Sequence, residues 1–283
     1  MGRWARSKQL AGASWGVLRE VKSLMVLPVI SGIASLAIAA SFAVPMFLTA
    51  EVTTTAGDSS VNPGVLTYVL GFSMYLALAY VAIFFKTAML CGADQHIRGQ
   101  TPSIGSAVSG AAAHADKILP WAIVTATISV ILRSLEQRAG LLGRIVIGFV
   151  GAAWAVVTFL VLPVLVFEGV GVVDAVKRSG TMFKQTWGEN LLANMGIGLI
   201  TFLLILPAVL VGVGAAASGS LPVVVAGVSL AAIWIIGVAC WSSAMSAVFQ
   251  LALYRYATQA EMPAQFAAVD LSDAFRHEKA GVV

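Results

Sequence analysis

The run IVIGFVGAAWAVVTFLVLPVLVF, residues 145–167, contains no charged side chain. A helix rises about 1.5 Å per residue, so about 20 apolar residues cross the roughly 30 Å hydrocarbon core of a bilayer. This run is long enough to cross the hydrocarbon core, and an uncharged run of this length is not typical of a soluble domain. It therefore predicts a transmembrane helix and sets the class of the whole chain.

The composition of the chain agrees with this prediction. Of its 283 residues, 59% are hydrophobic and only 11% are charged, and the mean hydropathy is +0.92. Soluble domains usually carry about 25% charged residues. No polar stretch is long enough to build a soluble domain, and Cys91 and Cys240 form neither a disulfide framework nor a metal-binding spacing. Most of the surface is therefore expected to contact lipid.

Other apolar stretches extend the prediction from one span to about six. They cover approximately residues 24–48, 64–85, 118–132, 191–216 and 221–254. The second of these could continue as a helix to residue 98, and the third is the shortest and weakest. The predicted fold class is an all-α membrane protein with about six transmembrane helices. We expect them in three approximate pairs, each preceded by a short cytoplasmic interfacial helix.

The positions of Lys and Arg indicate how the spans are oriented. Basic residues gather before the first predicted span, between the second and third, between the fourth and fifth, and after the sixth. Because cytoplasmic loops carry the excess of Lys and Arg, both termini are predicted in the cytoplasm and the protein in the cytoplasmic (inner) membrane. The segment with Arg133, Arg138 and Arg144 lies on the predicted outer side and breaks this rule. Either the topology differs there, or the segment folds back into the interface with Arg133 and Glu136 as an ion pair, which we favour.

The cytoplasmic links resemble one another, which indicates an internal repeat. Each combines a short amphipathic helix with the span that follows, and an offset of 165 pairs Ser14 with Ser179 and Arg19 with Lys184. The middle copy, residues 104–120, keeps the layout but has few charges. We therefore predict a single polytopic membrane domain followed by a polar cytoplasmic tail. The domain covers residues 1–259, its approximate repeats cover 1–98, 99–168 and 169–259, and the tail covers 260–283.

Charged and aromatic residues in these links form the candidate site. Basic side chains can face anionic lipid headgroups, and indole rings anchor helices at the membrane boundary. The candidate surface for lipid headgroups or a partner protein consists of Arg19, Lys22, Glu168, Lys177, Arg178, Trp187 and Glu189. The predicted partners are anionic membrane lipids, with a membrane protein as a second possibility. The net charge of +4 does not indicate nucleic acid, because the basic residues sit in short links between apolar runs.

The sequence contains no constellation that predicts catalysis. His96, His114 and His277 have no metal-ligand spacing, and no G-x-S-x-G, H-E-x-x-H or P-loop motif occurs. We therefore expect no catalytic residue, cofactor or metal site. The central parts of most spans also lack the ionisable residues that proton-coupled transporters usually carry.

Three functions remain, in decreasing order of preference. The first is a non-enzymatic accessory or scaffold subunit in the cytoplasmic membrane. The second is a transporter or lipid-handling protein without buried ion-coupling charges, for which a cavity lined by Tyr75, Tyr80 and Ser243 is predicted. The third is a membrane enzyme acting on lipid phosphates, which would rest on Glu168, Glu189 and the basic residues beside them.

Several stretches of the chain carry a family resemblance. They include residues 14–24, Trp187-Gly188-Glu189 and Asp273-Ala274-Phe275-Arg276, and they are spread over nearly the whole chain. These stretches resemble an uncharacterised bacterial integral membrane family, a domain of unknown function, which implies a six-helix architecture and no assigned reaction. The segment 177–189 is also similar in layout to the membrane domain of glycerophosphodiester phosphodiesterases, but no counterpart of their catalytic domain occurs. Lys86 departs from the family pattern, because a small neutral polar residue is expected there.

Overall fold

The regular structure of the protein is helical apart from one short β-hairpin. The structure is a computed structural model that describes residues 22–49, 51–55, 58–62 and 64–258. The helices are η1 (Lys22–Met25), α2 (Val26–Thr49), α3 (Val65–Ile97), α4 (Ile104–Ala112), α5 (Ala115–Arg138), α6 (Leu141–Val157), α7 (Val161–Phe167), α8 (Val172–Ala217) and α9 (Leu221–Ala257). The hairpin consists of β1 (Glu51–Thr55) and β2 (Asp58–Asn62), which pair antiparallel between α2 and α3.

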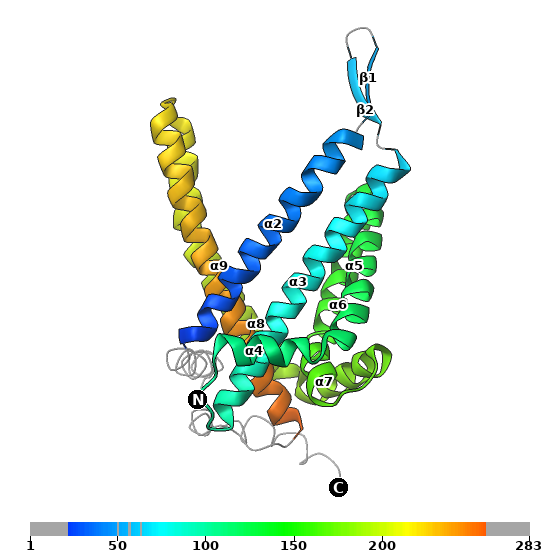
Figure 1. Cartoon of the computed structure of the whole chain (residues 1–283), viewed down its shortest axis with the longest axis vertical. Coiled ribbons are helices and arrows are strands. Elements are labelled where there is room, and N and C mark those ends of the chain that lie inside the picture. Colours follow the sequence, from blue (N-terminus) through cyan, green and yellow to red (C-terminus); the bar gives the residue numbers. More distant parts are fainter. Residues whose placement is uncertain (1–21, 50, 56–57, 63, 259–283) are drawn as a thin grey trace.

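The helices form two arms that diverge from a common base (Figure 1). One arm is the pair α8 and α9, and the other contains α2, α3, α5 and α6. The base is the end of the molecule at which α2 begins and α9 ends, and it also holds α4 and α7. The hairpin lies at the opposite end. Contacts between the arms are therefore concentrated near the base.

Among the described residues, five helical segments are long and apolar enough to cross a membrane. They are Val26–Met46, Val65–Ile97, Ala115–Arg138, Leu141–Phe167 and Leu221–Arg255. These segments confirm five of the predicted spans, including the weak one at residues 118–132. The predicted span 191–216 falls in α8, whose described apolar portion, Thr201–Ala217, is shorter. The arrangement of six spans as three repeats therefore stays a prediction.

The predicted interfacial helices have three different outcomes. Segment 104–120 contains the separate helix α4, which begins with a capping box in which the hydroxyls of Ser103 and Ser106 each accept from the other's N–H at 3.0 Å. Segment 174–190 is not a separate helix, because no proline interrupts residues 172–206 and α8 runs through it. The predicted helix at residues 14–22 lies outside the described residues, apart from Lys22 in η1.

The predicted span 145–167 is divided by a short break between α6 and α7. Pro163 accounts for the break, since its ring would clash with the helical carbonyl four residues earlier. Ser179 of α8 reaches into the gap, where its hydroxyl donates to the Val157 carbonyl at 2.6 Å and accepts from the Leu160 N–H at 3.1 Å. The backbone groups freed by the break are thus satisfied by a neighbouring helix, as membrane proteins require.

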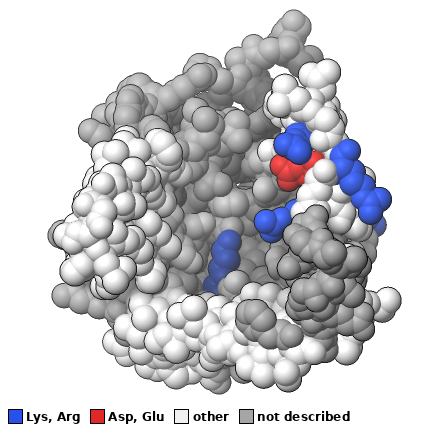
Figure 2. Space-filling model, turned by 90° about the horizontal axis from the view of Figure 1, so that it is seen from above, with Lys and Arg blue, Asp and Glu red and all other residues white. Residues whose placement is uncertain are grey.

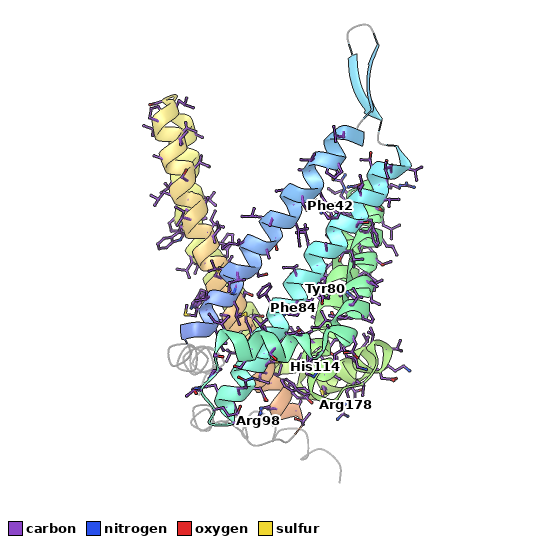
Figure 3. All side chains as sticks on the ribbon, viewed as in Figure 1. Phe42, Tyr80, Phe84, Arg98, His114 and Arg178 are labelled. Carbon is purple, nitrogen blue, oxygen red and sulfur yellow. The ribbon has the colours of Figure 1, made fainter. Side chains whose placement is uncertain are left out.

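Side-chain packing is dense at the base and sparse along the arms. Buried residues of α3, α7 and α9 form one hydrophobic cluster with the start of α2. Its large, fully buried side chains include Leu27, Leu90, Leu165, Met245 and Leu251. Farther from the base both arms carry exposed apolar side chains, which project outward in Figure 3. Such surfaces suit contact with lipid tails, which are as apolar as leucine.

Small residues and a hydrogen bond hold the α8–α9 arm together. Gly227 faces Ala215 so closely that a side chain at position 227 would collide with it. The Trp234 indole N–H donates to the Leu204 carbonyl at 2.8 Å. Close backbone approach and interhelical hydrogen bonds are the usual means by which helices associate in a bilayer, where no hydrophobic effect drives them together.

Candidate functional site

A cavity of about 380 Å³ lies where α9 meets α3, α5 and the α6–α7 break. Ligand pockets typically have volumes of about 300–1,000 Å³. Seen from the hairpin side, the surface is hollowed between the arms, and a basic side chain is visible within the hollow (Figure 2). The hydroxyl, amide and ammonium groups that line the cavity belong to Tyr75, Lys86, Thr125, Ser129, Thr158 and Gln250.

The cavity extends from the middle of the spans towards the base. Tyr75 and Lys86 line it on α3 and are 11 positions apart (86 − 75), which corresponds to roughly 16 Å along the helix axis. The lining between them consists of Ala79, Ala82 and Ile83. By the same measure Lys86 lies roughly 32 Å from the start of α3, near the edge of a hydrocarbon core of about 30 Å. The α3 wall of the cavity is therefore apolar between Tyr75 and Lys86, and Lys86 is the cation nearer the base.

Lys86 has no partner for its charge. Its side chain is partly buried, and it makes no hydrogen bond or salt bridge with any residue that the structure describes. The sequence placed it at the end of the second span, and the predicted continuation of that helix is confirmed, because α3 continues for 11 positions (97 − 86) to Ile97 and Lys86 lies within it. Unpaired charges at membrane depth cost several kcal/mol and usually have a functional role.

The lining of the cavity also carries hydrogen-bond acceptors. Gln250 is only 3% exposed, and its Oε1 has no partner within the described part of the chain. The hydroxyls of Thr125 and Thr158 donate to backbone carbonyls of their own helices at 2.9 and 2.7 Å. Each hydroxyl has one hydrogen, so only oxygen lone pairs are left for the cavity. A molecule bound there would meet these acceptors and also several donors, which are the Lys86 ammonium, the Gln250 amide N–H groups and the hydroxyls of Tyr75 and Ser129.

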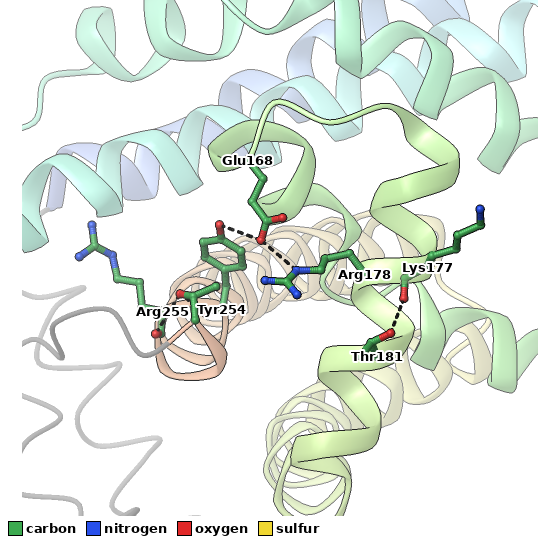
Figure 4. Close-up of polar contacts among 7 residues, drawn as sticks. Glu168, Lys177, Arg178, Thr181, Tyr254 and Arg255 are labelled. Carbon is green, nitrogen blue, oxygen red and sulfur yellow. Dashed lines mark hydrogen bonds and ion pairs between the residues drawn. The ribbon is translucent and has the colours of Figure 1, made fainter.

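A second polar group lies at the base, where the end of α9 meets the link between α7 and α8 (Figure 4). Glu168 Oε1 accepts hydrogen bonds from the Tyr254 hydroxyl and from Arg178 Nε, both at 3.4 Å. Lys177 points away from Glu168, and its ammonium lies 4.0 Å from Asp174. The structure therefore brings Glu168 and Arg178 of the predicted surface together and leaves Lys177 apart.

A third polar group joins α3 to the end of α9. Asp94 is 7% exposed and forms ion pairs with Arg255 and, at 2.8 Å, with Arg98. None of these three residues is in the site predicted from the sequence. The i,i+4 spacing of Asp94 and Arg98 is a visible signal, whereas nothing in the sequence connects Asp94 with Arg255. Across the described residues, no three His, Cys, Asp or Glu side chains come together as metal ligands.

The other predicted site residues take no part in these groups. The residues that lie outside the described structure, entirely or with their side chains, are Arg19, Lys22, Trp187 and Glu189. Arg133 and Glu136 are exposed near the end of α5, and no salt bridge joins them in the described part of the chain. The chain passes directly from α5 to α6 through Ala139 and Gly140, and the fold-back of this segment into the membrane interface stays a prediction. The helix simply continues beyond its apolar run.

The cavity expected of a lipid-handling protein has a partly different lining. Tyr75 borders it, but Tyr80 and Ser243 do not. Tyr80 packs instead against Phe84, with ring centroids 6.1 Å apart (Figure 3). Lys86 and Gln250, which the sequence did not assign to a site, also line the cavity.

Apolar helices of membrane-crossing length place this chain among helical, membrane-embedded proteins. The chain belongs to a family of unknown function, DUF6159, whose family model matches residues 65–263. The resemblance to an uncharacterised family is confirmed in this respect. No curated protein and no solved structure matches the chain. The similarity to glycerophosphodiester phosphodiesterases and the bacterial origin therefore have no support from these comparisons.

Proposed function

We propose that the protein is a lipid-handling membrane protein that binds an amphiphile in the cavity near the base. The observation that carries this proposal is the cavity itself, which joins an apolar wall on α3 to the ammonium group of Lys86, a group with no partner among the described residues. A membrane lipid has the same division between a charged headgroup and an apolar chain. The sequence analysis predicted a lipid-handling protein without buried ion-coupling charges. The present proposal differs in that it assigns a charge in the cavity to Lys86.

The surroundings of the cavity support a lipid as its occupant. The helices that line it belong to membrane-crossing segments, and both arms carry exposed apolar side chains.

We also propose that the base faces the cytoplasm. Arg98 and Arg178 lie at the base (Figure 3), whereas the charged residues of the hairpin are Glu51 and Asp58. This distribution follows the excess of Lys and Arg in cytoplasmic loops, and it supports the cytoplasmic membrane as the location. The arginines at the α5–α6 turn are the exception.

The accessory role predicted from the sequence stays a second proposal. It requires a partner protein, and exposed apolar residues of the α8–α9 arm, such as Leu210, Val213 and Ile233, offer a surface for one. The same side chains suit lipid equally well. The cavity therefore favours the lipid-handling function. Both proposals are non-enzymatic, in keeping with the lack of a catalytic motif in the sequence.

Filling the cavity tests the proposed function. Ala79→Phe would place a large side chain on the apolar α3 wall, whereas Leu230→Phe changes an exposed position on α9. Native mass spectrometry in mild detergent should show bound lipid on the wild type and on Leu230→Phe, and loss of that lipid in Ala79→Phe. Equal lipid retention by all three proteins, each monodisperse in size-exclusion chromatography, would rule the proposal out.

A further inference from the structure

We infer that the cavity selects an anionic headgroup that carries its own hydrogen-bond donor, with Lys86 as the cation and Gln250 as an acceptor. The inference rests on the proposed function and names the class of lipid. A glycerol phosphodiester headgroup has this chemistry, because its phosphate is anionic and its glycerol hydroxyls can donate.

The negative charge follows from how the carboxylates near the base are engaged. Asp94 is paired with two arginines, and Glu168 accepts from one arginine and one tyrosine. Neither carboxylate forms a salt bridge with Lys86 in the described structure. An anionic ligand would supply the counter-charge that no described residue provides.

The hydrogen-bond donor follows from the acceptors that line the same cavity. Gln250 Oε1 is buried and unpaired among the described residues, and a buried acceptor without a donor is destabilising. Thr158 Oγ1 can only accept, since its hydrogen is bonded to the Trp154 carbonyl. A bare anion would bring further acceptors to these oxygens, whereas a hydroxyl on the headgroup would satisfy them.

The kind of donor follows from the charge of Lys86. An ethanolamine headgroup also carries N–H donors, but its ammonium group would lie beside the ammonium of Lys86, and like charges repel. A choline headgroup is cationic and has no N–H or O–H at all. A hydroxyl can donate to the acceptors of the cavity, accept from its neutral donors and add no positive charge, so it is the best match to this site.

Three lipids that differ in one property at a time test the inference. Phosphatidylglycerol is anionic with hydroxyls, phosphatidylethanol is anionic without them, and phosphatidylcholine is zwitterionic without donors. The full chain in mild detergent is titrated with each lipid, and bound lipid is counted by native mass spectrometry. Phosphatidylglycerol should bind best and phosphatidylcholine worst, with about a 5-fold difference at each step, which corresponds to about 1 kcal/mol.

Single substitutions assign each preference to its residue. Lys86→Gln should lower phosphatidylglycerol binding about 5-fold and remove the preference for phosphatidylethanol over phosphatidylcholine, whereas Lys86→Arg should keep that preference. Gln250→Leu should remove the preference for phosphatidylglycerol over phosphatidylethanol and leave the charge preference intact. Lys177→Gln changes an exposed lysine at the base and should leave all three affinities unchanged.

Four other results would contradict the inference or the function behind it. Equal binding of phosphatidylglycerol and phosphatidylcholine by the wild type would overturn the headgroup inference and leave the lipid-handling function standing. Loss of preference in Lys177→Gln instead of Lys86→Gln would move the selectivity to the surface and also overturn the inference. No bound lipid at all would overturn both. Displacement by soluble glycerol 3-phosphate would support the headgroup chemistry but assign the site to a soluble phosphate, against the lipid-handling function.

Discussion

Asp94 and Arg255 form an ion pair at the base, although 161 positions separate them in the sequence. Asp94 belongs to α3 and Arg255 to the last turn of α9, so the pair ties one arm to the other. Tyr254, the preceding residue, contacts Glu168 in the link between α7 and α8. The end of α9 therefore contacts both α3, through Arg255, and the α7–α8 link, through Tyr254.

Asp94→Asn should destabilise the protein by about 2–4 kcal/mol, because it leaves the largely buried Arg255 guanidinium without its counter-charge. Thermal unfolding in a single detergent measures the change. Asp174→Asn is the matched control, since Asp174 is exposed and its contact with Lys177 contributes at most about 1 kcal/mol. Equal effects of the two variants would mean that the pair at the base does not join the arms.

Ser179→Ala should cost about 1–3 kcal/mol, because it removes the hydroxyl that pairs with the Val157 carbonyl and the Leu160 N–H. Thr181→Ala, on the same helix, removes an exposed hydroxyl bonded within α8 and should change stability by less than about 0.5 kcal/mol. Parallel thermal unfolding compares the two. If the two variants have the same melting temperature, the break between α6 and α7 does not depend on Ser179.

Tyr254→Phe should cost only about 0.5 kcal/mol, because the hydrogen bond to Glu168 is long, at 3.4 Å, and the ring stays in place. Tyr254→Ala should cost about 3–5 kcal/mol, since it also removes a buried ring that stacks on Phe167 with centroids 5.6 Å apart. Thermal unfolding again provides the comparison. A large loss in Tyr254→Phe would show that Glu168, and not ring packing, holds the end of α9.

Lys86→Met should stabilise the lipid-free protein by about 1 kcal/mol, because it replaces an unpaired ammonium group by an apolar side chain of similar length. Added phosphatidylglycerol should raise the melting temperature of the wild type but not of the variant, since only a ligand that binds the folded state stabilises it. Both effects are read from melting curves with and without lipid. A less stable lipid-free variant would instead indicate that Lys86 has a partner inside the protein.

Ser59→Cys should react with a membrane-impermeant thiol reagent in intact cells, because the hairpin lies at the end opposite to the base. The test needs a background in which Cys91 and Cys240 are replaced by Ala. Lys177→Cys, at the base, should react only after permeabilisation. The reverse labelling pattern would invert the proposed orientation.

Apolar length is a local property, and for that reason the spans were predictable from the sequence. Any uncharged run such as residues 145–167 favours a helix across a bilayer, whatever surrounds it. The sequence indicates the position of the break within that run but not the side chain that stabilises it. Pro163 marks a kink, but the hydroxyl that satisfies the broken backbone comes from Ser179 on another helix.

The candidate site was predictable only where partners lie close together in the chain. Glu168 and Arg178 stand ten positions apart, and the structure joins them. The partner of Asp94 depends on how α9 packs against α3, which no spacing in the sequence reveals. The same packing buries Gln250 and brings it to the cavity that Lys86 lines. Lys86 itself was visible only as an unexpected residue type.

The divergence of the two arms leaves part of the molecule without a protein core. Away from the base, large apolar side chains such as Leu36 and Ile236 are exposed on α2 and α9. In a bilayer, acyl chains would fill the wedge between the arms and pack against these side chains as leucine would. Hydrocarbon is then a component of the tertiary structure. The angle between the arms becomes a property of the thickness and composition of the bilayer as much as of the amino-acid sequence.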